Sequence, residues 1–277
     1  MITFKQFLAE GRSQPIELKK ALAWMEANAL KYLNGGTYFF RGIKGEHSKT
    51  IKYANTAEGE PRKSIGGMAN YYTLWMSYNP KWEDKPRRER SFIVSTSQVD
   101  AISWGKLHYV IPSDTSKIGA VGANDIWNKR VTPELRLGAF TNQTRNLFRM
   151  IGSGKEFSQE EFDTYAELAS AMKSVSMDEI VDVLKEHGYM FDNEFEKYMH
   201  KMFLDNKAKN LFEVWEIVFD PKHFDFMKTD HIHGEGEFWI DGEALYIPFD
   251  KTMPDEDREA LEDWAKKHAP AFGRAIS

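Results

Sequence analysis

The sequence predicts an α+β fold whose sheet is built from segments far apart in the chain. Extended apolar runs lie toward both ends of the sequence, whereas the middle shows helical periodicity. Strands grouped apart from helices are typical of α+β domains rather than of alternating α/β folds. We therefore expect one domain over 14–277, with flanking helices and a helical insertion at about 145–205.

Strands are expected where β-branched and aromatic residues cluster between turn-forming residues. The stretches that meet this criterion are 37–40, 92–97, 107–111, 211–219, 236–240 and 244–247. The stretch 44–66 is polar and rich in glycine, lysine and glutamate, so we expect a loop there.

Helices are expected where apolar residues recur every three or four positions. Pro15 suits the first turn of a helix, and a pair of glycines ends that helix. Ser158 and Ser176 are each followed three residues later by glutamate, which is the capping-box pattern. The expected helices are 15–33, 71–78, 99–104, 158–173, 176–187, 193–204 and 254–268.

The composition excludes several classes of function. The chain has 37 basic and 42 acidic side chains and a net charge of −5, so no global positive field attracts nucleic acid. It has no cysteine, which excludes disulfides, thiolate catalysis and cysteine-ligated zinc. No apolar run approaches the roughly 18 to 20 residues of a membrane span, so we expect a soluble protein without membrane partners.

Two polar motifs end predicted strands in the first half of the chain. Arg41 and Gly42 follow an aromatic run; a guanidinium suits phosphate, and glycine lets a ligand approach the backbone closely. Ser95, Thr96 and Ser97 end the next strand, where hydroxyls can bind a ligand or orient a carboxylate. Each motif taken alone is more often structural than functional.

A third motif enters a late predicted strand. Glu235 and Glu237 alternate with glycines, which permit a tight turn. The two carboxylates point the same way if the backbone is extended, and on a loop they can diverge, one toward each substrate. An arginine on an early strand, then Ser-Thr-Ser on a second, then Glu-x-Glu entering a late strand is an unusual combination. It favours a functional over a structural role for the three motifs.

In this order the motifs resemble those of the Arg–Ser–Glu class of mono-ADP-ribosyltransferases, found among bacterial toxins and enzymes injected by T-even-like bacteriophages. The resemblance covers roughly 37–250 and leaves the helical stretch at about 145–205 unaligned. It implies a split β-sheet core, NAD as substrate, no metal, and transfer of ADP-ribose to a host target with release of nicotinamide.

The resemblance also implies a role for each site residue. Glu237 would be the catalytic carboxylate beside the nicotinamide ribose, oriented by Ser95. Arg41 would grip the diphosphate or that ribose, and Gly42 would hold the carboxamide through its backbone. Glu235 would contact the acceptor, for which arginine on a host protein is the first choice and nucleic acid the second. The remaining expected NAD-binding residues are Thr96, Ser97 and Lys117; Lys117 is assigned to a phosphate-binding loop, with a solvated lysine as the alternative.

The N-terminus carries a separate signal. The stretch 8–11, Leu-Ala-Glu-Gly, resembles the Leu-x-Glu cleavage signal of prohead proteases in such phages. This implies a leader over 1–13 that is cleaved after Glu10, packaging in the capsid interior, and delivery to the host cytoplasm. A frayed amphipathic helix is the alternative.

Two other functions stay open. His231, His233 and Glu237 match the His-x-His-x3-Glu metal motif of cupins, although the second cupin motif is absent and the helical middle suits a barrel poorly. The chain could also be a non-catalytic phage virion protein that retains the sheet without the activity.

Overall fold

The computed structural model describes residues 13–44, 49–58, 71–86, 88, 90–151, 162–249 and 253–277. The expected cleavage point after Glu10 and the capping pair that begins at Ser158 lie outside these residues. The described residues form two compact units, one within 13–58, 85–124 and 224–277, the other within 71–84 and 125–223. No helix in the described ranges has the length and apolarity to cross a membrane.

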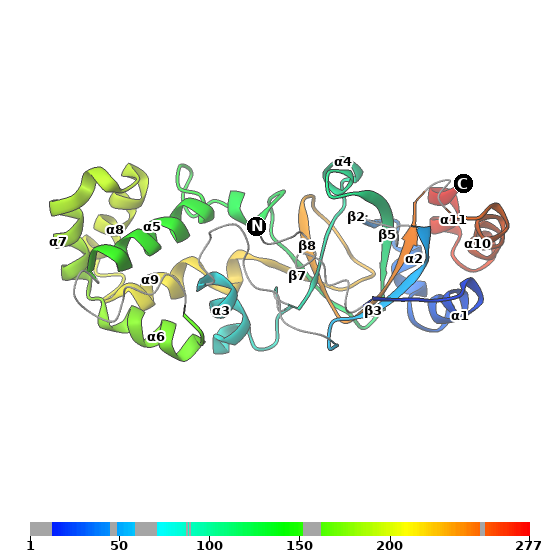
Figure 1. The fold of residues 1–277 in the computed structure, drawn as a ribbon, viewed down its shortest axis with the longest axis horizontal. Helices are drawn as coiled ribbons and strands as arrows, with labels where there is room; N and C mark the ends of the chain where they lie inside the picture. Colours follow the sequence, from blue (N-terminus) through cyan, green and yellow to red (C-terminus); the bar gives the residue numbers. More distant parts are fainter. Residues whose placement is uncertain are drawn as a thin grey trace. The chain divides into compact units, whose positions relative to one another are not determined.

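The first unit is built on an antiparallel sheet of nine strands (Figure 1). In chain order they are β1 (Ser13–Pro15), β2 (Phe39–Ile43), β3 (Lys52–Asn55), β4 (Phe92–Ser95), β5 (Lys106–Pro112), β6 (Lys117–Ala120), β7 (Asp225–Met227), β8 (Glu237–Asp241) and β9 (Glu243–Pro248). Their order in the sheet is β1-β3-β9-β5-β2-β4-β8-β6-β7. The predicted α+β class is confirmed, and β2, β4, β5, β8 and β9 lie where strands were predicted.

Two predictions near the N-terminus are wrong. Pro15 ends the edge strand β1, opposite Lys52, instead of beginning a helix. An edge strand tolerates proline because one side of its backbone needs no hydrogen bond. The stretch predicted as a loop, 44–66, contains β3, which pairs with both β1 and β9. The polar composition of this stretch did not indicate a strand, because its pairing depends on distant parts of the chain.

The sheet is strongly curled. β8 ends at Asp241 and β9 begins at Glu243, yet β5, β2 and β4 lie between them in the sheet. In a flat sheet these two strands would be about 19 Å apart, which Gly242 alone cannot span. The rings of Phe92 on β4 and Tyr246 on β9 also lie only 5.7 Å apart. The two halves of the sheet therefore face each other around a shared apolar core.

Helices cover the sheet of the first unit. They are α1 (Leu18–Asn28), α2 (Leu30–Asn34), α4 (Gln98–Ile102), α10 (Asp255–His268) and α11 (Pro270–Ile276). Aromatic packing joins α2 and α11 to the strands: Tyr32 stacks on Phe39, and Phe272 lies against Tyr109. The single predicted helix over 15–33 is instead two helices, α1 and α2, that meet at Ala29.

The second unit is helical. Its helices are α3 (Tyr71–Tyr78), α5 (Leu137–Ile151), α6 (Tyr165–Ser174), α7 (Met177–His187), α8 (Asn193–Leu204) and α9 (Leu211–Val218), with short 3₁₀ turns at Pro80–Trp82, Ile126–Asn128, Gly188–Met190 and Pro221–His223. A cluster of buried aromatic rings around Trp75, Phe140 and Trp215 forms its core. The helical insertion is thus larger than the predicted 145–205, and α3 belongs to it.

The strand predicted over 211–219 is wrong, because this stretch is helix α9. Its buried residues are Leu211, Val214, Trp215 and Val218, which recur at helical spacing. Asn210 begins the helix by accepting a hydrogen bond from the backbone N–H of Glu213. We predicted a strand because the stretch is rich in β-branched and aromatic residues. The spacing of its buried residues and its N-cap are instead typical of a helix.

A buried histidine makes the stability of the first unit depend on pH. His108 lies on β5 opposite Arg41 of β2 and has no exposed surface. Its Nδ1–H donates to the carbonyl of Lys106 at 2.9 Å, and no described residue hydrogen-bonds its Nε2. Burial, together with the charges of Lys52 and Lys106, lowers the pKa of His108 to about 4.

We expect the free energy of unfolding to fall as the pH drops from 6.5 to 4. The unfolded chain protonates this imidazole near its ordinary pKa of 6.5, whereas the folded chain does so only near 4, so acid favours the unfolded state. The loss from this group is about 3 kcal/mol. Urea unfolding at several pH values measures it, and His108→Gln should flatten the slope. Equal slopes for the two proteins would contradict this account.

Candidate functional site

Three of the sequence motifs lie on neighbouring strands of the first unit. Phe40 of β2 pairs with Ser95 of β4, and Ser95 pairs with Glu237 of β8. Directly paired residues of antiparallel strands project to the same face. The hydroxyl of Ser95 and the carboxylate of Glu237 therefore start side by side, although 142 positions (237 − 95) separate them in the chain.

The sheet divides beside this row. Phe40 and Ser95 are the one described pair between β2 and β4, whereas β2 continues along β5 and β4 along β8. Arg41 begins on the opposite face from Glu237, because successive residues of a strand alternate. Its guanidinium donates to the carbonyl of Ile93 on β4, beyond the point where the strands separate. The mostly buried Arg41 thus connects the two strands at the split.

Gly42 is needed for packing. A side chain at this position would place its Cβ 2.3 Å from the carbonyl oxygen of Ala101 and 2.4 Å from the amide nitrogen of Gly105. The backbone of α4 and the turn after it therefore lie directly on β2. This packing accounts for the glycine, and the contact of Gly42 with a carboxamide stays a prediction.

The carboxylate of Glu237 is buried, and the two hydrogen bonds described for it reach the same oxygen. Its Oε1 accepts hydrogen bonds from Nε1 of Trp239 at 2.6 Å and from Nε of Arg88 at 3.2 Å. The side chain of Glu237 is 4% exposed and that of Arg88 is 16% exposed. Because the pair is largely removed from water, its charges are weakly screened. The carboxylate is thus held from two sides, by Trp239 of strand β8 and by Arg88 of the segment before β4.

The backbone around Glu237 is equally constrained. The N–H of Glu237 donates to the carbonyl of Ala123 at 2.8 Å, and its carbonyl accepts from Val121 at 3.0 Å. Gly236 has a φ of 104°, and a Cβ there would lie 2.3 Å from the oxygen of Ala123. The glycine before the glutamate is therefore required by both its backbone conformation and the close approach of residue 123.

Two of the three hydroxyls of the Ser-Thr-Ser motif stabilise the turn into α4. Ser95 Oγ accepts from the N–H of Ser97 at 3.0 Å, and Ser97 Oγ accepts from the N–H of Asp100 at 3.2 Å. Thr96 donates weakly, at 3.5 Å, to the carbonyl of Gly234. No hydrogen bond described joins Ser95 to Glu237, whose carboxylate accepts from Arg88 and Trp239, so the orientation of Glu237 by Ser95 stays a prediction.

Glu235 and Glu237 diverge, as the glycines around them suggested. Glu235 is exposed, whereas Glu237 is buried. Gly234 and Gly236 on either side of Glu235 both have positive φ, 89° and 104°. Solvent therefore reaches the carboxylate of Glu235, whereas that of Glu237 is covered by protein.

Lys117 does not lie in the predicted loop, because it belongs to strand β6. Lys117 begins β6 opposite Asp241, at the end of β8 remote from Glu237. Asp241 lies four positions after Glu237 on β8, which is about 13 Å in an extended strand. The exposed side chain of Lys117 fits the alternative interpretation, a solvated lysine.

The geometry does not favour the cupin-like metal site. The rings of His231 and His233 lie 6.4 Å apart on exposed residues. The carboxylate of Glu237 is engaged by Arg88 and Trp239, away from solvent. Within the part of the chain that the structure describes, no group of three or more potential ligands is arranged to hold a metal ion.

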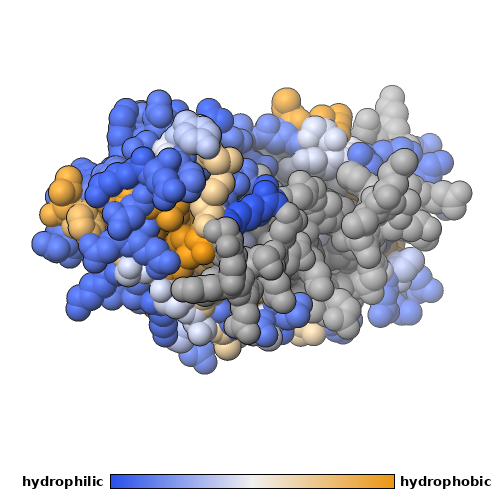
Figure 2. Space-filling model, turned by 60° about the vertical axis from the view of Figure 1, so that its left-hand side comes forward, coloured by the Kyte–Doolittle hydropathy of each residue, from blue (hydrophilic) through white to orange (hydrophobic). Residues whose placement is uncertain are grey.

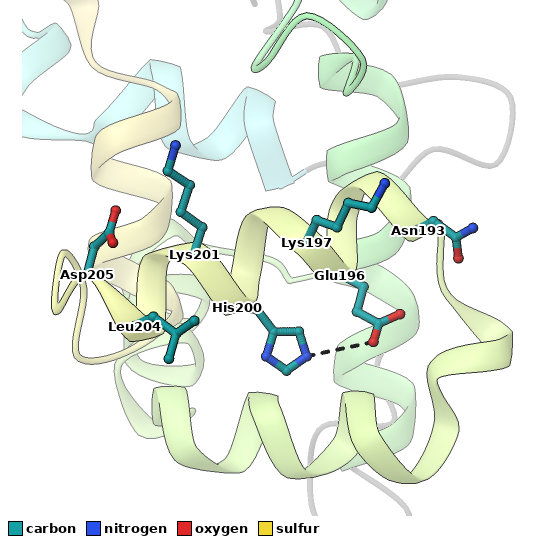
Figure 3. A pocket seen from close by; sticks show the side chains of 7 residues that line it. All are labelled: Asn193, Glu196, Lys197, His200, Lys201, Leu204 and Asp205. Carbon is teal, nitrogen blue, oxygen red and sulfur yellow. Dashed lines mark ion pairs between the residues drawn. The ribbon is translucent and has the colours of Figure 1, made fainter.

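The cavities described lie elsewhere. One of about 450 Å³ is a groove along a single segment, lined by Asn193, Glu196, Lys197, His200, Lys201, Leu204 and Asp205. Figure 3 shows His200 turned toward Glu196, with which it pairs at 3.7 Å, and both lysines turned away from that pair. Another, of about 380 Å³, lies between β9 and the two C-terminal helices and includes Phe249 and Arg258. Neither cavity includes a residue of the three sequence motifs.

Exposed apolar side chains are scattered rather than gathered. Figure 2 shows a mostly hydrophilic surface on which apolar residues form separate patches. The large exposed apolar side chains described are Tyr78, Val99, Ile102, Tyr189, Met190 and Leu204. The convergence around Glu237 is therefore the strongest candidate for a functional site. Comparison of the chain with family models, curated proteins and solved structures found no match.

Proposed function

We propose that the chain is a mono-ADP-ribosyltransferase that cleaves NAD and passes ADP-ribose to a host target, with Glu237 as its catalytic carboxylate. One observation supports this most: Ser95 on β4 pairs directly with Glu237 on β8, and β4 also adjoins β2, the strand of Arg41. The three motifs come from distant stretches of sequence, and unrelated motifs would rarely fall on adjoining strands of one sheet.

The sheet supports the finer part of the fold proposal, a split core. Its halves separate beside Phe40 and Ser95, and its curl turns them toward each other. A separation of strands leaves backbone and side-chain groups that can face a ligand, whereas a continuous ladder does not. Arg41 lies at this separation and contributes a permanent positive charge, which suits a diphosphate.

The reaction breaks the bond between C1′ of the ribose and the nicotinamide nitrogen. Nicotinamide leaves with that electron pair, positive charge develops on the ribose, and an acceptor nitrogen then bonds to C1′ and loses a proton. A fixed carboxylate such as Glu237 stabilises the developing charge, as carboxylates do in glycoside hydrolysis. Glu235, which is exposed, is suited to receive the acceptor and to orient or deprotonate its guanidinium.

The acceptor that best fits Glu235 is an arginine of a host protein, and a nucleic acid is the second choice. Packaging in a phage capsid and delivery to the host cytoplasm rest on the leader sequence alone. Intact mass measurement of the protein from virions tests this part, because cleavage after Glu10 removes ten residues.

Mass spectrometry of a bacterial lysate tests the proposal. The lysate is incubated with NAD and either the wild type or Glu237→Gln. We expect ADP-ribosylated arginines with the wild type only. Absence of both transfer and nicotinamide release in the wild type would instead indicate a non-catalytic virion protein.

A further inference from the structure

We propose that Arg88 is a positioning residue for the reaction, and that together with Trp239 it sets the direction of the Glu237 carboxylate. This inference rests on the proposed function. It assigns to an arginine outside every sequence motif the orienting role that the resemblance gave to Ser95.

Both hydrogen bonds described for this carboxylate end on the same oxygen. Nε of Arg88 and Nε1 of Trp239 approach Oε1 from different parts of the chain, the segment before β4 and the strand β8 itself. Two donors on one oxygen fix the rotation of the carboxylate plane and thereby define where Oε2 lies. An unrestrained glutamate would instead sample several rotamers, and fixing one of them when the substrate binds would cost conformational entropy.

The charge of Arg88 matters as much as its geometry. Glu237 is nearly inaccessible to water, and an ionised carboxylate in such a place requires a charged or hydrogen-bonding partner. Trp239 supplies a neutral donor, whereas Arg88 supplies a positively charged one. The ion pair with Arg88 thus helps to maintain the negative charge that the oxocarbenium-like state needs.

Arg88→Ala tests this assignment through steady-state nicotinamide release. We expect kcat to fall about 100-fold, the scale of a misplaced catalytic group, while KM for NAD changes little. Arg88→Lys should retain part of kcat, and ethylguanidinium in the buffer should restore part of it to Arg88→Ala. Arg258→Ala is the matched control, since it removes another ion-paired arginine of the first unit, 2.9 Å from Asp255, without an expected effect.

A second variant covers the case in which Arg88→Ala fails to fold. Trp239→Phe keeps most of the ring but removes the other donor to Oε1, so we expect the same loss of kcat with little change in KM. Wild-type kcat in Arg88→Ala, or a loss that neither lysine nor ethylguanidinium restores in a folded protein, would overturn the role of Arg88. If the wild type itself releases no nicotinamide, the proposed function is at fault and the inference fails with it.

Discussion

Glu237→Gln should lower the rate of nicotinamide release from NAD by about 100- to 1000-fold, the range found when one preorganised charge-stabilising group is removed. Glutamine keeps the shape of the side chain but removes its negative charge. The effect should appear in kcat, because the carboxylate interacts most strongly with positive charge that develops only in the transition state.

Glu235→Gln is the control for that variant. It lies two residues away on an exposed turn, and we expect it to reduce transfer to the acceptor while hydrolysis of NAD continues. Thermal unfolding of both variants separates chemistry from folding, since Glu237 is also the partner of Arg88. A folded Glu237→Gln with nearly wild-type nicotinamide release would remove Glu237 from the mechanism.

Gly42→Ala should cost about 3 kcal/mol or more of stability, because the new methyl group meets backbone atoms that cannot rotate away. The nearest of these, the oxygen of Ala101, lies 2.3 Å from the ideal Cβ position. To accommodate it, α4 must move away from β2, and the Ser-Thr-Ser turn that begins α4 must move with it.

Gly119→Ala is the matched control for this substitution. Gly119 also lies in a strand of the first unit, but its Cβ would meet only side-chain atoms at 3.4 Å and beyond, which is ordinary contact. We expect a change below about 1 kcal/mol there. Urea unfolding of both variants decides the matter: equal stability of Gly42→Ala and Gly119→Ala would contradict the close packing of α4 on β2.

Local patterns in the sequence predicted most individual elements. Helix α8 runs over Asn193–Leu204, as its periodicity predicted, and Ser176 caps α7 through the N–H of Glu179. The wrong predictions arise where pairing or packing with distant parts of the chain determines the structure of a segment. β3 is a strand because β1 and β9 flank it, and the curl of the sheet follows from the one-residue link between β8 and β9.

For the site, too, the sequence predicted the local features but not the long-range contacts. The three motifs indicated which strands form the site, because an arginine, hydroxyls and a carboxylate beside predicted strands are visible in the sequence. The partners of Glu237 were not visible in the same way. Trp239 lies two residues along the same strand, so the alternation of side chains could have indicated it. Arg88 is 149 positions from Glu237, and only the fold brings the two together.

A crystal structure of Glu237→Gln with NAD tests the central claim most directly, because the slowed variant preserves the intact dinucleotide. The account predicts the nicotinamide ribose beside residues 95 and 237, with C1′ about 3.5 Å from the side chain at 237. NAD bound to another part of the chain, or no NAD bound at millimolar concentration, would contradict it.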